Sequence, residues 1–361
     1  MTFREKFSEL AAEQFLYQPG ALNAITDVPG VQVGHLTLSD PSQKIATGVT
    51  AIWPNRDIYQ KRYFAGGHVL HGTGEMTGLL QVQEWGVIET PIVLCPSLMV
   101  GRAHSAIVRL MCDENPGIGA DEDVVLPVVA ECDDSFLNSA RNFVITEDQI
   151  VQTLKKCTGS DSEKILQGSV GAGTGMIAFD YKGGIGTASR RVKVAGKAAS
   201  ELAGKTDERE FIVGALLNAN FGFARQLRVA GQRVGLGASV DRGTGARGLP
   251  LELKKFAGRP ITKERSVIVV LATNAPLRPD QIRRLCVRAT LALGRVGSFA
   301  GHGSGEIVIG FSTANSNQRV KADEAPVSVT HEFLHDSHLN SFYEATVEAV
   351  EEAVYNALFS Q

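Results

Sequence analysis

The chain has 361 residues, with 36 lysines and arginines against 39 aspartates and glutamates and a formal net charge of −3. This balance provides no positive field for nucleic acid or for an acidic membrane surface, so neither partner is expected. With 43% hydrophobic and 21% charged residues, the composition is that of a globular protein and excludes a disordered chain.

The termini and the cysteines predict a cytoplasmic protein. The N-terminal sequence MTFREKFSELAAEQF lacks the apolar core of a secretory signal, and no run approaches the roughly 20 apolar residues of a membrane helix. The cysteines are far apart and form no C-x-x-C pair: Cys95, Cys112, Cys132, Cys157 and Cys286. We therefore expect reduced thiols, without a disulfide framework or a cysteine-rich zinc site.

In the first half, short β-branched runs bounded by glycine and proline predict strands at 30–38, 47–53, 68–86 and 90–96. A polar stretch at 146–164 is typical of a surface helix. The glycine-dense segment 168–191 predicts strand, turn and strand. The basic, glycine-rich segment 234–265 predicts an exposed connector in which backbone cleavage is tolerated.

The second half alternates strand and helix signals. Residues 267–272 are an unbroken apolar run that predicts a strand buried on both faces. Pro279 and Asp280 open a helix with an apolar stripe at 282, 285, 286, 289 and 293. A strand is expected at 306–314, and Ser341 with Glu344 forms a capping box for a C-terminal helix.

One string matches a metal-site motif, because residues 331–335 read H-E-x-x-H. On a helix this spacing places His331 and His335 on one face for zinc, with Glu332 as general base. The strong helical pattern begins only near Ser341, so a solvated approach to the C-terminal helix explains the string equally well. Phosphate-binding glycine loops and the G-x-S-x-G elbow are absent from the sequence.

Polar residues at three places near the ends of predicted strands are the other candidate site residues. Ser266 opens the most apolar strand, where a hydroxyl has no packing role. Ser304 and Glu306 stand among three glycines at the mouth of another strand, a spacing that allows close backbone approach. Asn220 lies near the end of an apolar run.

Taken together, several blocks in one order resemble the self-processing serine aminopeptidases of the DmpA type, the family of L-aminopeptidase/D-esterases and β-peptidyl aminopeptidases. The resemblance runs nearly end to end, through NAITDVPGVQVGH (23–35), GTGEMTGLLQVQEWGVIETPI (72–92), PVVAE (127–131), ANFG (219–222), SVIVVLATNAPL (266–277) and GSGEIVIGFSTAN (303–315). It implies a four-layer α/β/β/α sandwich with two stacked sheets, as a single catalytic domain over 1–361.

The resemblance also implies a mechanism. The chain would cleave itself at Arg265-Ser266 into 1–265 and 266–361, and Ser266 would become an N-terminal nucleophile whose own α-amino group, with a pKa near 8, takes the hydroxyl proton. Ser304 would relay or orient this proton, Glu306 would orient Ser304 or hold the substrate's ammonium, and Asn220 would donate to the oxyanion. The expected substrate is a small peptide, amide or ester, no cofactor or metal is required, and the processed units would form a homo-oligomer, a tetramer.

Several departures from the family pattern leave alternatives open. Arg265 stands where relatives commonly have a small residue, so an unprocessed member that serves as a binding or structural subunit is a second hypothesis. A zinc peptidase built on the 331–335 string is a third, and the sequence does not separate hydrolysis from acyl transfer to an amine. Residues 94–101, 131–138 and His71 also differ, which bears on the preference among L-, D- and β-amino acids.

Overall fold

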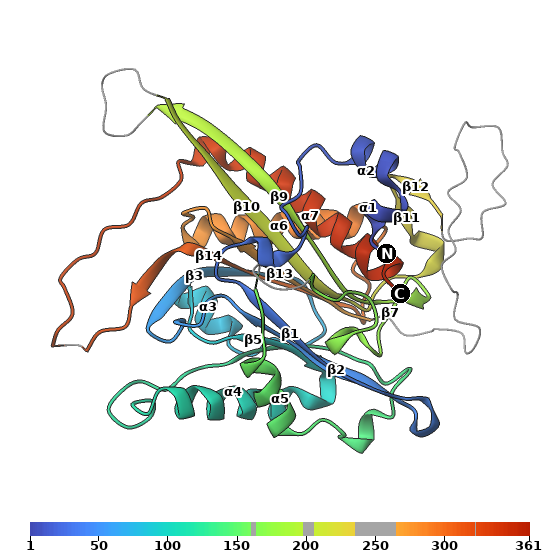
Figure 1. Cartoon of the computed structure of the whole chain (residues 1–361), viewed down its shortest axis with the longest axis horizontal. Coiled ribbons are helices and arrows are strands. Elements are labelled where there is room, and N and C mark those ends of the chain that lie inside the picture. Colours follow the sequence, from blue (N-terminus) through green and yellow to red (C-terminus); the bar gives the residue numbers. More distant parts are fainter. Residues whose placement is uncertain (160–163, 198–205, 235–264, 322) are drawn as a thin grey trace.

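The computed structural model describes residues 1–159, 164–197, 206–234, 265–321 and 323–361. Most of the expected connector 234–265 lies outside the described residues. Within them, two larger sheets form the centre of the molecule (Figure 1). None of the helices in this part of the chain has the length and apolar character needed to cross a bilayer.

The smaller sheet has the strand order β1-β2-β5-β6. Its strands are β1 (Gln32–Asp40), β2 (Ile45–Trp53), β5 (Ile92–Pro96) and β6 (Val128–Cys132). The larger sheet has the order β4-β3-β14-β13-β10-β9. Its strands are β4 (Val87–Ile88), β3 (Lys61–Gly72), β14 (Gly305–Gln318), β13 (Val267–Thr273), β10 (Thr206–Ala219) and β9 (Gly184–Lys197). The short strands β7 (Ile177–Ala178) and β8 (Tyr181–Lys182) pair together, as do β11 (Arg228–Val229) and β12 (Gln232–Arg233).

Helices cover the outer face of each sheet, which gives the expected α/β/β/α sandwich (Figure 1). The long helices α6 (Pro279–Arg295) and α7 (Leu339–Phe359) lie on the larger sheet, and α4 (Val100–Glu114) and α5 (Glu147–Lys155) lie on the smaller one. The shorter helices are α1 (Phe3–Lys6), α2 (Ser8–Gln14) and α3 (Leu79–Trp85).

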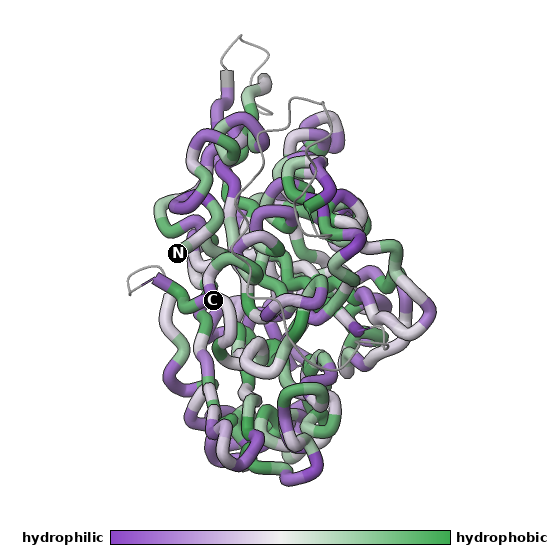
Figure 2. Tube along the Cα trace, turned by 90° about the vertical axis from the view of Figure 1, so that its right-hand side faces the viewer, coloured by the Kyte–Doolittle hydropathy of each residue, from purple (hydrophilic) through white to green (hydrophobic). Residues whose placement is uncertain are grey.

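Strand β13 is buried on both faces, by helices on one side and by the second sheet on the other. Side chains alternate between the two faces of a strand. Val267, Val269 and Leu271 pack with the helices above, whereas the alternate residues 268, 270 and 272 pack between the sheets. The predicted burial on both faces is therefore confirmed, and Figure 2 shows mostly hydrophobic segments at the centre of the molecule.

Several expected elements differ in detail. The strand predicted over 68–86 ends at Gly72, and 79–85 is helix α3, bounded by Gly78 and Gly86 in the left-handed conformation. Helix α7 starts at Leu339 and has no side-chain cap, so the capping box at Ser341 is wrong. Helix α5 ends at Lys155, short of the predicted 164. The segment 168–191 contains a 3₁₀ turn, the β7–β8 hairpin and the start of β9 in place of one strand pair.

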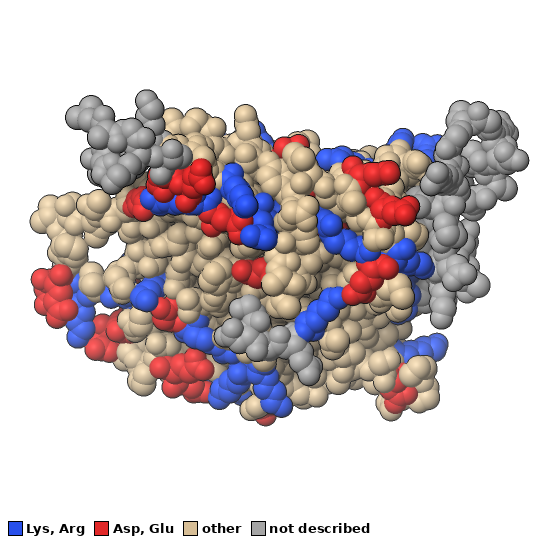
Figure 3. All heavy atoms as spheres, turned by 45° about the horizontal axis from the view of Figure 1, so that its top comes forward, with Lys and Arg blue, Asp and Glu red and all other residues tan. Residues whose placement is uncertain are grey.

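Basic and acidic side chains are interspersed on the face shown in Figure 3. Between β14 and α7, the described residues of the segment 319–332, which are 319–321 and 323–332, extend away from the body of the molecule (Figure 1). Most of its described residues are exposed.

Candidate active site

The larger sheet brings the site residues predicted from the sequence together at one end of its central strands. Strand β13 is antiparallel to β10, with Val267 opposite Ala219, and parallel to β14, with Val267 opposite Glu306. Ser266 precedes Val267 and Asn220 follows Ala219, so both stand at the same end of the sheet as Glu306. Pairing within one sheet thus joins segments that are far apart in the sequence.

The hydroxyl of Ser266 is held by backbone groups. The N–H of Gly305 donates to Ser266 Oγ at 3.2 Å, and Oγ lies 3.5 Å from the carbonyl oxygen of Thr73. A Cβ at position 305 would stand 2.4 Å from that carbonyl oxygen and 3.0 Å from Oγ. Only glycine therefore allows the first residue of β14 to approach the serine this closely.

Ser304 contacts the peptide bond that precedes Ser266. Its Oγ donates to the carbonyl oxygen of Arg265 at 2.5 Å and also makes a short hydrogen bond to Glu306 Oε1. A hydroxyl has one proton to donate, and a carbonyl oxygen has none. Both contacts are hydrogen bonds at once when the Glu306 carboxyl donates to Ser304 and Ser304 donates to the Arg265 carbonyl. Glu306 is fully buried.

Asn220 is fixed by two hydrogen bonds that leave its amide near the site. Its Oδ1 accepts from the N–H of Ile177 at 3.0 Å, and its Nδ2 donates to the carbonyl oxygen of Asp133 at 2.9 Å. The hydrogen bond to the Arg265 carbonyl thus comes from Ser304, whereas the resemblance assigns the oxyanion donor to Asn220.

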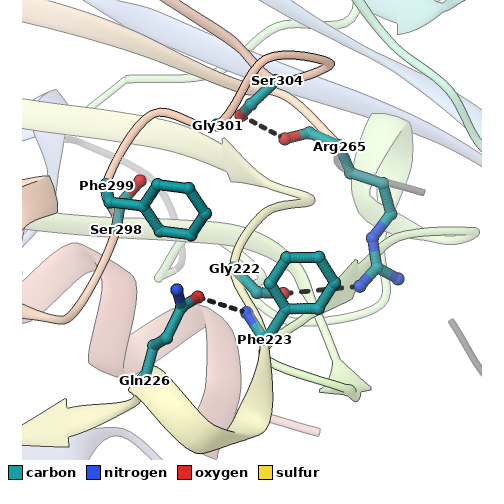
Figure 4. Close-up of a pocket in the computed structure, with 8 residues that line it drawn as sticks. All are labelled: Gly222, Phe223, Gln226, Arg265, Ser298, Phe299, Gly301 and Ser304. Carbon is teal, nitrogen blue, oxygen red and sulfur yellow. Dashed lines mark hydrogen bonds between the residues drawn. The ribbon is translucent and has the colours of Figure 1, made fainter. Parts of the chain in front are cut away.

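The side chain of Arg265 is buried beside the site (Figure 4). Its Nη2 lies 3.5 Å from the carbonyl oxygen of Gly222 and 3.6 Å from Asp180 Oδ1. Burial lowers the pKa of this guanidinium to about 10, against the opposing effect of Asp180. Arg265 lines a pocket together with the phenyl rings of Phe223 and Phe299.

A buried acid that the sequence did not single out as a site residue, Glu131, lies near the end of β6 and close to Ser266. Its Oε1 accepts from the N–H of Glu75 at 3.1 Å, and its Oε2 accepts a short hydrogen bond from Ser97. A Cβ built on Gly74 would lie 3.1 Å from Glu131 Oε1 and 3.8 Å from Ser266 Oγ, so carboxylate and hydroxyl border the same place. Burial raises the pKa of this carboxyl.

The H-E-x-x-H string does not form the helical zinc geometry of the alternative hypothesis. Residues 331–335 are not helical, because α7 begins only at Leu339, so the two imidazoles do not share a helix face. His331 Nε2 lies 3.2 Å from Asn317 Oδ1, and His335 Nδ1 accepts from the N–H of Ser337. Glu332 pairs with Arg209 instead of facing a metal. Among the described residues, no group of three histidine, cysteine or carboxylate side chains is placed to hold a metal ion.

Comparison with known proteins finds a peptidase family and several named aminopeptidases. The model of peptidase family S58 matches residues 23–361. The β-peptidyl aminopeptidase BapA of Sphingosinicella xenopeptidilytica is 38% identical over 354 residues, and the match covers 94% of this chain and 81% of the relative. The BapA of Sphingosinicella microcystinivorans is 35% identical over 352 residues, and that match covers 95% of this chain and 83% of the relative. A solved structure with a similar fold is the L-aminopeptidase D-Ala-esterase/amidase of Ochrobactrum anthropi, described as a prototype of the serine aminopeptidases with a variant of the Ntn-hydrolase fold. It superposes with a TM-score of 0.80 at 37% sequence identity, and the match covers 96% of this chain and 88% of that one.

Proposed function

The chain belongs to peptidase family S58 and is a serine aminopeptidase of the N-terminal-nucleophile type, and from this premise we propose that Ser266 is its nucleophile and is released by cleavage of the Arg265-Ser266 bond. The proposal makes 1–361 one catalytic domain that is processed into 1–265 and 266–361. The observation that carries it is the position of this bond: Ser304 Oγ donates to its carbonyl oxygen while Gly305 N–H holds the Ser266 hydroxyl.

In the processing step, Ser266 Oγ attacks the carbonyl carbon of Arg265. The developing negative charge falls on the oxygen that accepts from Ser304, and a donor aimed at that oxygen stabilises the transition state. The C–N bond to Ser266 breaks, the hydroxyl proton passes to the released nitrogen, and an ester links Arg265 to Ser266 Oγ. Water hydrolyses the ester, which leaves a carboxylate at Arg265 and a free amine at Ser266.

In turnover, the free amine of Ser266 accepts the proton of its own hydroxyl, because an α-amino group titrates near pH 8. Oγ then bonds to the carbonyl carbon of the substrate's first residue, the leaving amine takes the proton, and water hydrolyses the acyl-enzyme. An amide nitrogen carries two hydrogens, so Asn220 retains one for the oxyanion after donating to Asp133.

The substrate is a peptide, amide or ester with a free N-terminal amine. Glu306 faces Ser304 and orients it, so Glu131 is the carboxylate that we assign to the substrate's ammonium. The curated relatives are named β-peptidyl aminopeptidases, which supports β-amino acids as well as α-amino acids at the first position.

We also propose that the processed units associate as a homo-oligomer, a tetramer, in the cytoplasm. The extended segment 319–332 supports association, because it carries apolar side chains on an exposed surface. Val327 is fully exposed and Val329 is 65% exposed. We assign these exposed apolar side chains to the contact between units.

Ser266→Ala tests the proposal, with the exposed Ser328→Ala as a matched control. Wild type and S328A should give two chains, the smaller starting at Ser266, and should hydrolyse amino-acid p-nitroanilides. S266A should remain one chain of 38.6 kDa without activity. An S266A protein that is still cleaved or active would overturn the assignment, and a wild type that stays intact and inactive would favour the binding-subunit hypothesis.

A further inference from the structure

The buried place that the Arg265 side chain occupies, called its pocket below, borders an acid that is positioned independently of the arginine. Asp180 lies in the tight turn between β7 and β8, with a φ of 64°, and its Oδ2 accepts from the N–H of Ala224 at 2.9 Å. Its other oxygen, Oδ1, lies 3.6 Å from Arg265 Nη2. The carboxylate therefore stays at the pocket whichever side chain enters.

The fit between pocket and guanidinium is electrostatic and incomplete. Nε and Nη1 of Arg265 are buried and have no hydrogen-bond partner among the described residues. Next to the guanidinium lies a cavity that Arg265 itself lines together with Phe223, Phe299, Gly222 and Gly301 (Figure 4). A cage built for one particular arginine would satisfy all of its donors. The pocket of the Arg265 side chain instead offers one negative charge, from Asp180, and one carbonyl oxygen, from Gly222, which suit any long cationic side chain.

Chemistry places the substrate's first side chain in the same pocket. In processing, Ser266 Oγ bonds to the carbonyl carbon of Arg265, and in turnover it bonds to that of the substrate's first residue. Both acyl groups therefore pass through the same position next to Ser304. Because the new carboxylate of Arg265 must leave before a substrate enters, its side-chain pocket is vacated at the same time.

Resting on the proposed function, we infer that Asp180 is a specificity-determining residue that selects peptides and amides whose N-terminal residue carries a cationic side chain, lysine or arginine. The intact chain presents its own arginine to this pocket as the first cationic acyl residue. Apolar first residues enter the pocket without pairing to Asp180 and are the poorer substrates.

The test compares the p-nitroanilides of lysine and arginine with that of leucine. Wild-type kcat/KM should be at least about tenfold higher for the cationic substrates. Asp180→Asn should lower it about 10- to 100-fold for lysine and arginine and change it less than about threefold for leucine. Asp113→Asn, which changes an exposed acid on α4, is the matched control and should change neither. A wild type that prefers leucine, or a D180N protein that loses all three activities equally, would overturn the inference.

Processing is checked separately, because D180N leaves the buried Arg265 without its acid. The double variant D180N/R265G removes the guanidinium as well, and R265G alone is its reference. N-terminal sequencing should find Ser266 exposed in both, with the loss of cationic preference confined to the double variant. A double variant that is not processed would also overturn the inference, since Asp180 would then serve folding or cleavage. Failure of wild type on every substrate would refute the proposed function instead.

Discussion

The short contact between Ser304 and the Arg265 carbonyl leads to a quantitative prediction for Ser304→Ala. The variant removes a donor that lies 2.5 Å from the oxygen on which charge develops. Loss of one such donor typically costs about 2.7–4 kcal/mol of transition-state stabilisation, or a factor of about 10²–10³ in rate. Self-cleavage of S304A should therefore slow from wild type by this factor.

A time course of intact mass on freshly purified chain measures the cleavage rate. A thermal melt accompanies it, because the buried Glu306 carboxyl loses a hydrogen-bond partner at a cost of about 1–3 kcal/mol in stability. A folded S304A protein that is processed at the wild-type rate would refute the role of this hydroxyl.

Glu306→Gln tests the direction of the proton chain. The amide of glutamine still donates to Ser304 Oγ, as the neutral carboxyl does in the arrangement derived above, so processing of E306Q should stay within about tenfold of wild type. If E306Q slows as far as S304A, Glu306 acts as a carboxylate acceptor and the chain runs the other way.

Further predictions concern the substrate ammonium, the core and metal dependence. Because burial raises the pKa of Glu131, kcat/KM should fall as the pH drops through a value above the ordinary range of glutamate, and E131Q should lose this acid limb along with most of its affinity for substrates with a free amine; an unchanged limb in E131Q assigns it to another group. Arg190→Ala removes the buried cation that pairs with Glu348 and Glu352, of which Glu352 keeps Arg4. Chemical denaturation should show a loss of about 3–5 kcal/mol, whereas a loss below about 1 kcal/mol would contradict the pairing. Prolonged treatment with a chelator should leave activity unchanged, and loss of activity restored by zinc would revive the H-E-x-x-H hypothesis.

Local patterns predicted strand β13 and the apolar stripe of α6 because both depend on neighbouring residues in the sequence. The run over 267–272 indicated burial on both faces, yet it carried no information about which layer covers each face; the stacking of the two sheets came from the family resemblance alone. Helix α3 was missed because seven residues between two glycines give too short a period to distinguish from a strand.

The site itself was only partly accessible from the sequence. Ser266, Ser304 and Glu306 stood out as polar residues at strand mouths, and sheet pairing brings them together. Glu131 and Asp180 gave no such signal, because each is a single acid whose partner lies far away in the chain. The pairing of Asp180 with Arg265 spans the β7–β8 turn and the start of β13, and only the folded chain reveals it.

The interior position of β13 determines what happens to the protein after the backbone is cut. The smaller product would retain a strand with neighbours on both sides, since β10 comes from 1–265 and β14 from 266–361. The two products therefore remain one cooperative unit, and separating them requires melting the central sheet. Self-cleavage would free one amine while leaving the architecture undivided, so a nicked and an intact molecule should have the same hydrodynamic radius and differ only under denaturing conditions.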